Sequence, residues 1–261
     1  MTKTNKIIAV FICAIMLVTF AACRGNDINP NMSADPSANN SGSPFPIVPI
    51  DNFDGGDEKD PIATPLPYSR YRSMNSDVCG WITIDDTIIN YPIAQGKDND
   101  YYLKHDAAKD TSKQGCIFVD YECKVPDGRS IVMFGHNMKN GTMFANLINY
   151  TDKEFYNAHR VFYIYFGDTR YTYKVVSVYT VDGGNPKFMR VDFANDDEFA
   201  AYQNDMMSLS MYPVDTEIKP TDKMVTLVTC NRANYQNGRL AVHAVLIEKE
   251  NCDTSSLGNA K

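Results

Sequence analysis

One cysteine near the end of the chain has the surroundings of a reactive thiol. Cys230 closes the apolar run "VTLVTC", with Arg232 in the loop directly after it and Arg239 where the next apolar run begins. A thiolate is the reactive form of cysteine, and a nearby cation favours it over the thiol. A guanidinium also offers several donors to an oxyanion that develops on an attacked carbonyl. The segment indicates nucleophilic acyl-transfer chemistry.

Strand alternation favours one of these two arginines. The apolar runs on either side of the loop "NRANYQNG" are typical of two antiparallel strands. In such a hairpin, Cys230 and Arg239 lie opposite each other with both side chains on one face of the sheet. We favour Arg239 over Arg232 because a strand holds a side chain more rigidly than a loop does. His243 shares that face but lies roughly 13 Å along its strand from Arg239, too far to join Cys230.

An acyl-transfer site also needs a proton donor for the leaving amine, and this group is most often a histidine. Besides His243, the chain has His105, His136 and His159. His105 and His159 are expected on the surface. His136 ends the strand-like run "SIVMFGH" beside a polar loop, which is a position suited to chemistry. The residues alone leave the choice of histidine open.

The elements that must hold these side chains are mainly strands. Short runs rich in Val, Ile, Thr and aromatic residues predict about eight strands. A short helix is predicted over "YSRYRSMNSDVCG", closed by Gly80. A second helix is predicted over "NDDEFAAYQNDMMSLSMY", with Asn195 or Asp196 as N-cap. This pattern favours a β-barrel or a β-sandwich with inserted helices.

The start of the chain is typical of export. Two lysines precede an uncharged apolar run that ends at Cys23, so residues 1–23 are predicted to be a signal or membrane anchor. The ending "FAAC" resembles a lipobox, which would make Cys23 a site of lipid attachment. Both alternatives place the rest of the chain outside the cell, tethered to the membrane. Residues 24–66 are rich in Pro, Asn, Ser and Gly and are predicted to be a flexible extracellular tether.

The remaining residues are long enough for one domain with a sizeable core. We assign residues 67–252 to this domain and residues 253–261 to a C-terminal tail. The net charge of −7 argues against a nucleic-acid partner. Five cysteines follow the tether, so at least one thiol is unpaired in a monomer, and the pattern leaves any disulfides undetermined. They are Cys79, Cys116, Cys123, Cys230 and Cys252, and no C-x-x-C spacing among them predicts a zinc site.

Several of these segments resemble a known enzyme family. "TLVTC", followed by Arg239 at a strand start, resembles the TLxTC signature of sortases. "FGHNMKNGTMF" resembles the histidine segment of that family, and of class B sortases in particular. Together the similar segments span most of residues 75–248. The other two are "WITIDDTIINYPIAQGKDNDYYLKHD" and "GCIFVDYE", which resemble the N-terminal strands of class B.

The resemblance implies a mainly β fold and a set of roles. The fold would be the sortase-type eight-stranded β-barrel with an N-terminal helix and an inserted helix, near residues 195–210, before the catalytic strand. Cys230 would be the nucleophile and His136 the general acid and base. Arg239 would stabilise the oxyanion and the substrate backbone, and Thr229 would help to line the site.

The chain also departs from the class pattern. Val228 stands where class B members commonly have serine, and Asn231 follows the cysteine where an acidic residue is frequent. Cys116 occupies a strand position that is often small and polar. None of the three changes the catalytic residues, but we expect Val228 and Asn231 to alter contacts with the substrate.

The function implied is that of a cysteine transpeptidase on the outer face of a Gram-positive-type envelope. It would cleave a C-terminal sorting signal of surface proteins, similar to NPxTN or NPxTG, after Thr through a thioacyl intermediate. An amine of a peptidoglycan precursor or of a pilin would then accept the acyl group. The mechanism needs no cofactor or metal ion, and calcium is not indicated. Two alternatives are an extracellular cysteine hydrolase with water as acceptor and a non-enzymatic, lipid-anchored surface binding protein with a structural Cys230.

Overall fold

The computed structural model describes residues 66–231 and 237–252. In this part of the chain, no helix combines the length and the apolar character that crossing a membrane requires. Several predictions concern residues outside it, and they remain predictions. They are the signal or anchor with Cys23, the tether up to residue 65, Arg232 and the C-terminal tail.

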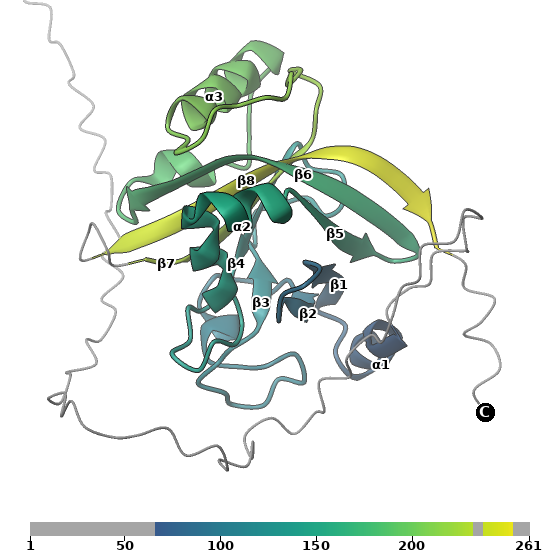
Figure 1. Cartoon of the computed structure of the whole chain (residues 1–261). Helices are drawn as coiled ribbons and strands as arrows, with labels where there is room; N and C mark the ends of the chain where they lie inside the picture. Colours follow the sequence, from purple (N-terminus) through teal and green to yellow (C-terminus); the bar gives the residue numbers. More distant parts are fainter. Residues whose placement is uncertain (1–65, 232–236, 253–261) are drawn as a thin grey trace, which may run out of the picture. The chain divides into compact units, whose positions relative to one another are not determined.

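A closed barrel is built from the eight strands of the described residues (Figure 1). Around the barrel the strands follow the order β1-β2-β3-β4-β7-β8-β6-β5, and β1 closes it by pairing with β5. The predicted eight-stranded barrel is therefore confirmed. The strands are β1 (Val78–Thr83), β2 (Asn90–Ala94), β3 (Ile117–Val119), β4 (Ser130–Phe134), β5 (Val161–Phe166), β6 (Thr169–Asp182), β7 (Met224–Cys230) and β8 (Gly238–Asn251).

Short helices connect and cover the strands. The predicted N-terminal helix and the helix inserted before β7 are both present, as α1 and α3. Three of the others are single 3₁₀ segments. The helices are α1 (Leu66–Met74), η1 (Tyr101–Leu103), η2 (Ala145–Thr151), α2 (Lys153–Ala158), η3 (Pro186–Met189) and α3 (Asp196–Ser208).

Gly80 corrects one detail of the sequence-based prediction. The first helix ends at Met74, and Gly80 lies inside β1 rather than at a helix end. A Cβ at this position would come within 2.7 Å of the carbonyl oxygen of Tyr165 in the neighbouring strand β5. The glycine thus permits a close approach of two strands, which is another common reason for glycine in a sheet.

The inserted helix α3 begins with a side-chain cap. The Asn195 side chain accepts a hydrogen bond from the Glu198 backbone amide at 2.9 Å, so Asn195 rather than Asp196 is the N-cap. The apolar face of α3 packs against β6, where the Ser177 hydroxyl donates to the carbonyl oxygen of Met206 at 2.7 Å. Figure 1 shows α3 on the side of the barrel where β6 and β8 lie. The helix therefore covers the barrel on the strand next to β8.

Two strand pairings bring distant segments together at one end of the barrel. Strand β7 pairs in parallel with β4, in a register that sets Phe134 opposite Val228. On its other edge, β7 pairs antiparallel with β8 in a register that sets Cys230 opposite Arg239. This second register is the one that strand alternation predicts, and it is confirmed. β7 is fully buried except for Cys230 at its end.

His243 lies deep in the same sheet, opposite Thr226. Its ring is completely buried, with Nδ1 2.9 Å from the hydroxyl of Thr226 and Nε2 2.8 Å from the hydroxyl of Tyr179. Burial lowers the pKa of His243 to about 3 because the charged imidazolium would lose its hydration. The ring is therefore a neutral core group, and the predicted exclusion of His243 from the Cys230 end is confirmed by its position.

This buried histidine should make the fold sensitive to acid. An unfolded histidine takes up a proton near pH 6.5, whereas folded His243 does so only near pH 3. Between these values the unfolded state binds more protons, so the free energy of unfolding falls as the pH falls, by up to about 1.4 kcal/mol per pH unit. We expect urea unfolding at pH 4.5 to show this loss relative to pH 7. His243→Gln, which can keep the hydrogen bonds but cannot titrate, should lose less; equal slopes would contradict the assignment.

Candidate active site

Three hydrogen bonds join the end of β4 to the end of β7. The Gly135 amide donates to the carbonyl oxygen of Val228 at 3.2 Å, which continues the parallel ladder by one residue. The Thr229 hydroxyl donates to the carbonyl oxygen of Gly135 at 2.8 Å. The Asn137 side-chain amide donates to the carbonyl oxygen of Cys230 at 2.8 Å. His136, between Gly135 and Asn137, is thereby held beside Cys230.

His136 is half-buried, and one hydrogen bond orients its ring. Its Nε2 lies 2.9 Å from the carbonyl oxygen of Leu103, the last residue of η1. A carbonyl can only accept, so Nε2 carries the hydrogen of the neutral ring and Nδ1 is the nitrogen that can take a proton. The His136 carbonyl oxygen accepts from the Phe144 amide at 3.0 Å, which closes the loop after β4.

Gly135 lets the chain enter this loop against the core. A Cβ there would lie 2.5 Å from Cδ1 of Ile117 and 2.7 Å from Cδ2 of Phe144. Real Cβ atoms do not approach other atoms so closely, and both neighbours are fully buried. The residue before His136 must therefore be glycine for the loop to keep its position.

Arg239 completes the group from the third strand. As paired residues of adjacent strands, Cys230 and Arg239 direct their side chains to the same face of the sheet. The guanidinium donates to the carbonyl oxygens of Gly238 at 3.0 Å and Asn237 at 3.3 Å. The turn after β6 packs against the stem of this arginine, because a Cβ on Gly183 would lie 3.2 Å from Cγ of Arg239. Arg239 is therefore held at the start of β8, next to Cys230.

The three residues expected to support the site are buried around it. Thr229 and Val228 are each 2% exposed, and Asn231 is 8% exposed. Asn231 donates from its side chain to the Thr180 hydroxyl at 3.1 Å and from its backbone amide to the carbonyl oxygen of Gly238 at 2.9 Å. In this structure the three side chains contact the protein interior and hold the backbone around Cys230.

Of the four histidines, the structure brings only His136 to Cys230. His105 stacks on Tyr101, with ring centroids 4.0 Å apart, and His159 stacks on Phe155 at 3.9 Å. Both are half-buried rather than fully exposed, and in each case Nδ1 bonds to a carbonyl of the same residue on which the ring stacks. Both rings are therefore occupied by contacts within their own segments.

Cys79, Cys116, Cys123 and Cys230 form no disulfide in the part of the chain that the structure describes. Burial raises the pKa of Cys79 and Cys123 to about 12, and it raises the pKa of Cys116 well above its ordinary value. These thiols remain protonated at neutral pH. Cys230 is half-buried at the open end of its strand.

We expect the different burial of these thiols to determine which cysteine of the folded protein is alkylated first. Iodoacetamide at pH 8 should modify Cys230 at least about tenfold faster than Cys79, Cys116 or Cys123, because only the thiolate reacts. Peptide mapping by mass spectrometry after a short exposure would measure this order. The same reaction in urea serves as the control, in which the four sites should react at similar rates. Preferential labelling of Cys79, Cys116 or Cys123 in the folded state would contradict the structure.

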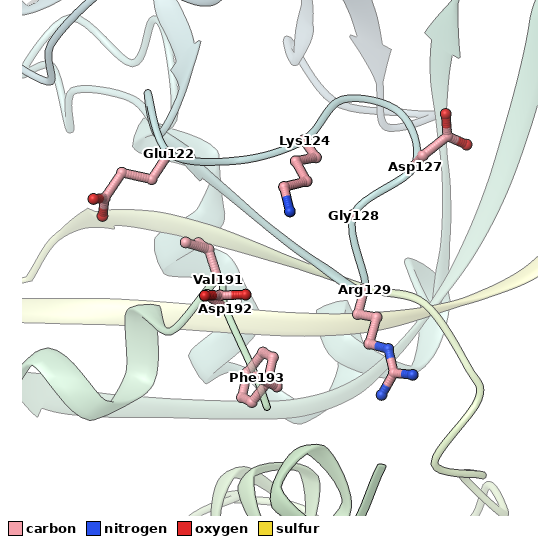
Figure 2. Close-up of a pocket in the computed structure, with 8 residues that line it drawn as sticks. All are labelled: Glu122, Lys124, Asp127, Gly128, Arg129, Val191, Asp192 and Phe193. Atoms are coloured by element: carbon pink, nitrogen blue, oxygen red, sulfur yellow. The ribbon is translucent and has the colours of Figure 1, made fainter. Parts of the chain in front are cut away.

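A surface cavity of about 490 Å³ lies elsewhere on the molecule (Figure 2). It is formed between the turn that leads into β4 and the segment that precedes α3. It therefore lies at the start of β4, at the opposite end of this strand from His136. No group of three or more His, Cys, Asp or Glu side chains in the described ranges is arranged to hold a metal ion. The cavity is lined by Glu122, Lys124, Asp127, Gly128, Arg129, Val191, Asp192 and Phe193.

Comparison with known proteins identifies the family to which this chain belongs. The sequence profile of the family described as "Sortase domain" matches residues 82–247, which include all eight strands at least in part. The chain belongs to the sortase family. Over 182 residues it is 36% identical to sortase B of Listeria monocytogenes, an alignment that covers 68% of this chain and 73% of that protein.

Solved structures of sortases support the same class. The X-ray structure of Clostridium perfringens sortase B superposes with a TM-score of 0.66 at 33% identity, covering 69% of this chain and 99% of that one. A Staphylococcus aureus sortase B–substrate complex gives a TM-score of 0.65 at 27% identity, covering 71% of this chain and 87% of that one. This sortase falls in class B, and its activity is that of a cysteine transpeptidase.

Some contacts of the sortase site were not predicted from the sequence. The Leu103 carbonyl that orients His136 and the Asn137 amide that reaches Cys230 both join segments far apart in the chain. A backbone carbonyl carries no sequence signal. Asn137 offers a weak one, since it directly follows the candidate histidine in a polar loop.

Proposed function

We propose that Cys230, His136 and Arg239 perform the acyl transfer of this sortase. The observation that supports this most is the convergence of three strand ends, with β4 and β8 on the two edges of β7. The strand ends that carry a partly exposed thiol, a histidine and an arginine therefore lie side by side. These are the three groups that a covalent acyl transfer needs: a nucleophile, an acid and base, and a donor for the oxyanion.

In the first half-reaction, the sulfur of Cys230 attacks the carbonyl carbon of a Thr residue in the substrate. The thiol proton passes to Nδ1 of His136, and the carbonyl oxygen gains negative charge beside Arg239. To bind this oxygen, the guanidinium turns from the carbonyls of Asn237 and Gly238, which hold it at the start of β8. Collapse of the intermediate breaks the C–N bond, and His136 gives its proton to the leaving amine. A thioester on Cys230 remains.

In the second half-reaction, an amine attacks the thioester carbonyl. His136 accepts the amine proton and returns it to the departing sulfur, so that an amide is released and the thiol of Cys230 is restored. Arg239 stabilises the oxyanion of this step as it did in the first. No electron acceptor is required, and each proton removed in one half-reaction is returned within it.

The class resemblance indicates the substrates. We propose sorting signals similar to NPxTN or NPxTG near the C-terminus of surface proteins, cleaved after Thr, and an amine of a peptidoglycan precursor or of a pilin as acceptor. The solved complex of the S. aureus relative contains a substrate. The enzyme would act on the outer face of the membrane, tethered by residues 1–23 or by a lipid on Cys23. Mass spectrometry of the native N-terminus would distinguish an intact anchor from a lipidated Cys23.

The function can be tested by trapping the acyl-enzyme. The purified chain is incubated with a peptide library built on NPxTN and NPxTG, and the mass of the peptide containing Cys230 is measured. A thioester adduct on Cys230, together with a ligated product when triglycine or a lysine peptide is added, supports the proposal. Release of the free acid alone, even at high amine concentration, would instead indicate a hydrolase. No adduct with any peptide would favour a binding protein.

A further inference from the structure

Asn137 is an exposed residue whose side chain reaches across to Cys230. It lies in the loop after β4, directly after His136, and its amide donates to the carbonyl oxygen of Cys230 at 2.8 Å. The other two bonds between these strand ends involve Gly135, Val228 and Thr229, which precede the two candidate catalytic residues. Of the three, the Asn137 bond alone involves Cys230 itself.

This bond holds one side of the peptide group that follows Cys230. The other side of the same peptide is the Asn231 amide, which donates to the carbonyl oxygen of Gly238 in β8 at 2.9 Å. With its C=O bonded to the β4 loop and its N–H bonded to β8, the peptide plane is fixed from both edges. The rotation of Cys230 about its Cα–C bond is therefore fixed too. β7 ends at Cys230, and in the described residues its ladder with β4 ends at the bond between Gly135 and Val228, before the bond from Asn137.

Asn137 belongs to a loop that several hydrogen bonds hold in place. A β-bridge joins Asn137 to Met143, and the Met143 amide donates to the Tyr91 hydroxyl at 3.1 Å. The next amide, of Phe144, donates to the carbonyl oxygen of His136 at 3.0 Å. The same short loop thus fixes the backbone of His136 and, through Asn137, the backbone of Cys230. The loop therefore limits how far the backbones of His136 and Cys230 can move relative to each other.

We propose that Asn137 is a positioning residue for the acyl transfer: it holds the Cys230 backbone so that the thiol faces the imidazole of His136. This inference rests on the proposed roles of Cys230 and His136. Asn137 acts through Cys230 and needs no contact with the substrate. Its loss should slow the chemical steps and leave substrate binding nearly unchanged, because a displacement of about 1 Å between reacting groups can cost about 100-fold in rate.

Three substitutions separate the hydrogen bond from the bulk of the side chain. Asn137→Ala removes the donor. Asn137→Asp keeps the shape but sets a carboxylate, which cannot donate, against the Cys230 carbonyl. Asn137→Gln keeps an amide donor on a longer stem. We expect kcat to fall about 10- to 100-fold for Ala and at least as much for Asp, with partial rescue by Gln and KM within about twofold of the wild type. The substrate is the peptide that gives the highest adduct yield in the library experiment.

Asn140→Ala is the matched control. Asn140 is an exposed asparagine of the same loop, and its side chain accepts hydrogen bonds from the amide and hydroxyl of Thr142, within the loop itself. It should keep kcat within about twofold. Thermal unfolding of each variant verifies that turnover is measured on folded protein, and the side chain of Asn137 is exposed, so its loss opens no core cavity.

The outcomes separate this proposal from the one on which it rests. A fall in kcat for Ala and Asp with partial rescue by Gln supports it. Unchanged kcat in folded Asn137→Ala and Asn137→Asp overturns it, as does a rise in KM alone, which would make Asn137 a substrate contact. An equal loss in Asn140→Ala would also overturn it, because the effect would then belong to the whole loop. Turnover that survives in Cys230→Ala would instead refute the proposed nucleophile.

Discussion

Cys230→Ala is expected to abolish turnover of a sorting-signal peptide, with a loss in kcat on the order of 10⁶-fold, the scale reported when a protease loses its nucleophile. Without the sulfur no thioester forms, and neither half-reaction can begin. The fold should persist, because the residue is only half-buried at the end of β7 and the change removes a single heavy atom. Peptide cleavage, adduct mass and thermal unfolding measure the three effects.

Cys79→Ala is the matched control for this experiment. Cys79 is also half-buried and unpaired, but it lies in β1, and its thiol donates to the carbonyl oxygen of Ile93. Activity should stay within about twofold of the wild type. Turnover retained by Cys230→Ala would show that another residue is the nucleophile, and loss of activity in both variants would point to a general effect on the fold.

Arg239→Ala is expected to lower kcat/KM by about 100- to 1,000-fold, the usual result of removing one oxyanion donor. The reason is positional: the pairing of Cys230 with Arg239 sets the guanidinium on the face of the sheet that bears the thiol. Arg239→Lys keeps the charge but loses the planar fork, so its activity should be intermediate. Steady-state kinetics at saturating and at low peptide concentration would separate transition-state stabilisation from binding of the substrate backbone.

Arg232→Ala tests the competing arginine. It removes the same kind of side chain from the loop after Cys230, and it should keep most of the activity. If Arg232→Ala abolished turnover while Arg239→Ala did not, the assignment of the oxyanion donor would be wrong. Similar large losses in both would mean that the two arginines share the role.

The register of Cys230 and Arg239 could be predicted because a hairpin is a local structure. Alternation along two strands joined by a short loop determines which residues face each other. The same reasoning excluded His243, whose burial against Thr226 and Tyr179 now explains its presence on an apolar strand. The eight strands were predictable for a similar reason, since each is a short run of β-branched and aromatic residues.

His136 could not be chosen by local reasoning. The parallel pairing of β4 with β7 brings the segment that carries it to the end of β7. Parallel neighbours are joined by long crossovers, which leave no signal of spacing in the sequence. Family resemblance supplied that link. Gly80 shows the opposite case: glycine after a helical pattern resembled a helix end, but the tertiary contact with β5 determines its place.

The parallel pairing of β4 with β7 also decides when during folding the chain can become reactive. Gly135 and Thr229, which are 94 residues apart, must meet before the thiol and the imidazole lie together. Contacts of such long sequence separation form slowly, because the entropy of closing the loop is lost before the pairing compensates for it. The β5–β6 hairpin, by contrast, pairs two strands that follow each other directly in the chain. A newly made molecule would thus gain the proposed nucleophile–histidine pair only once β4 and β7 have paired, and we expect incompletely folded chains to form no thioesters.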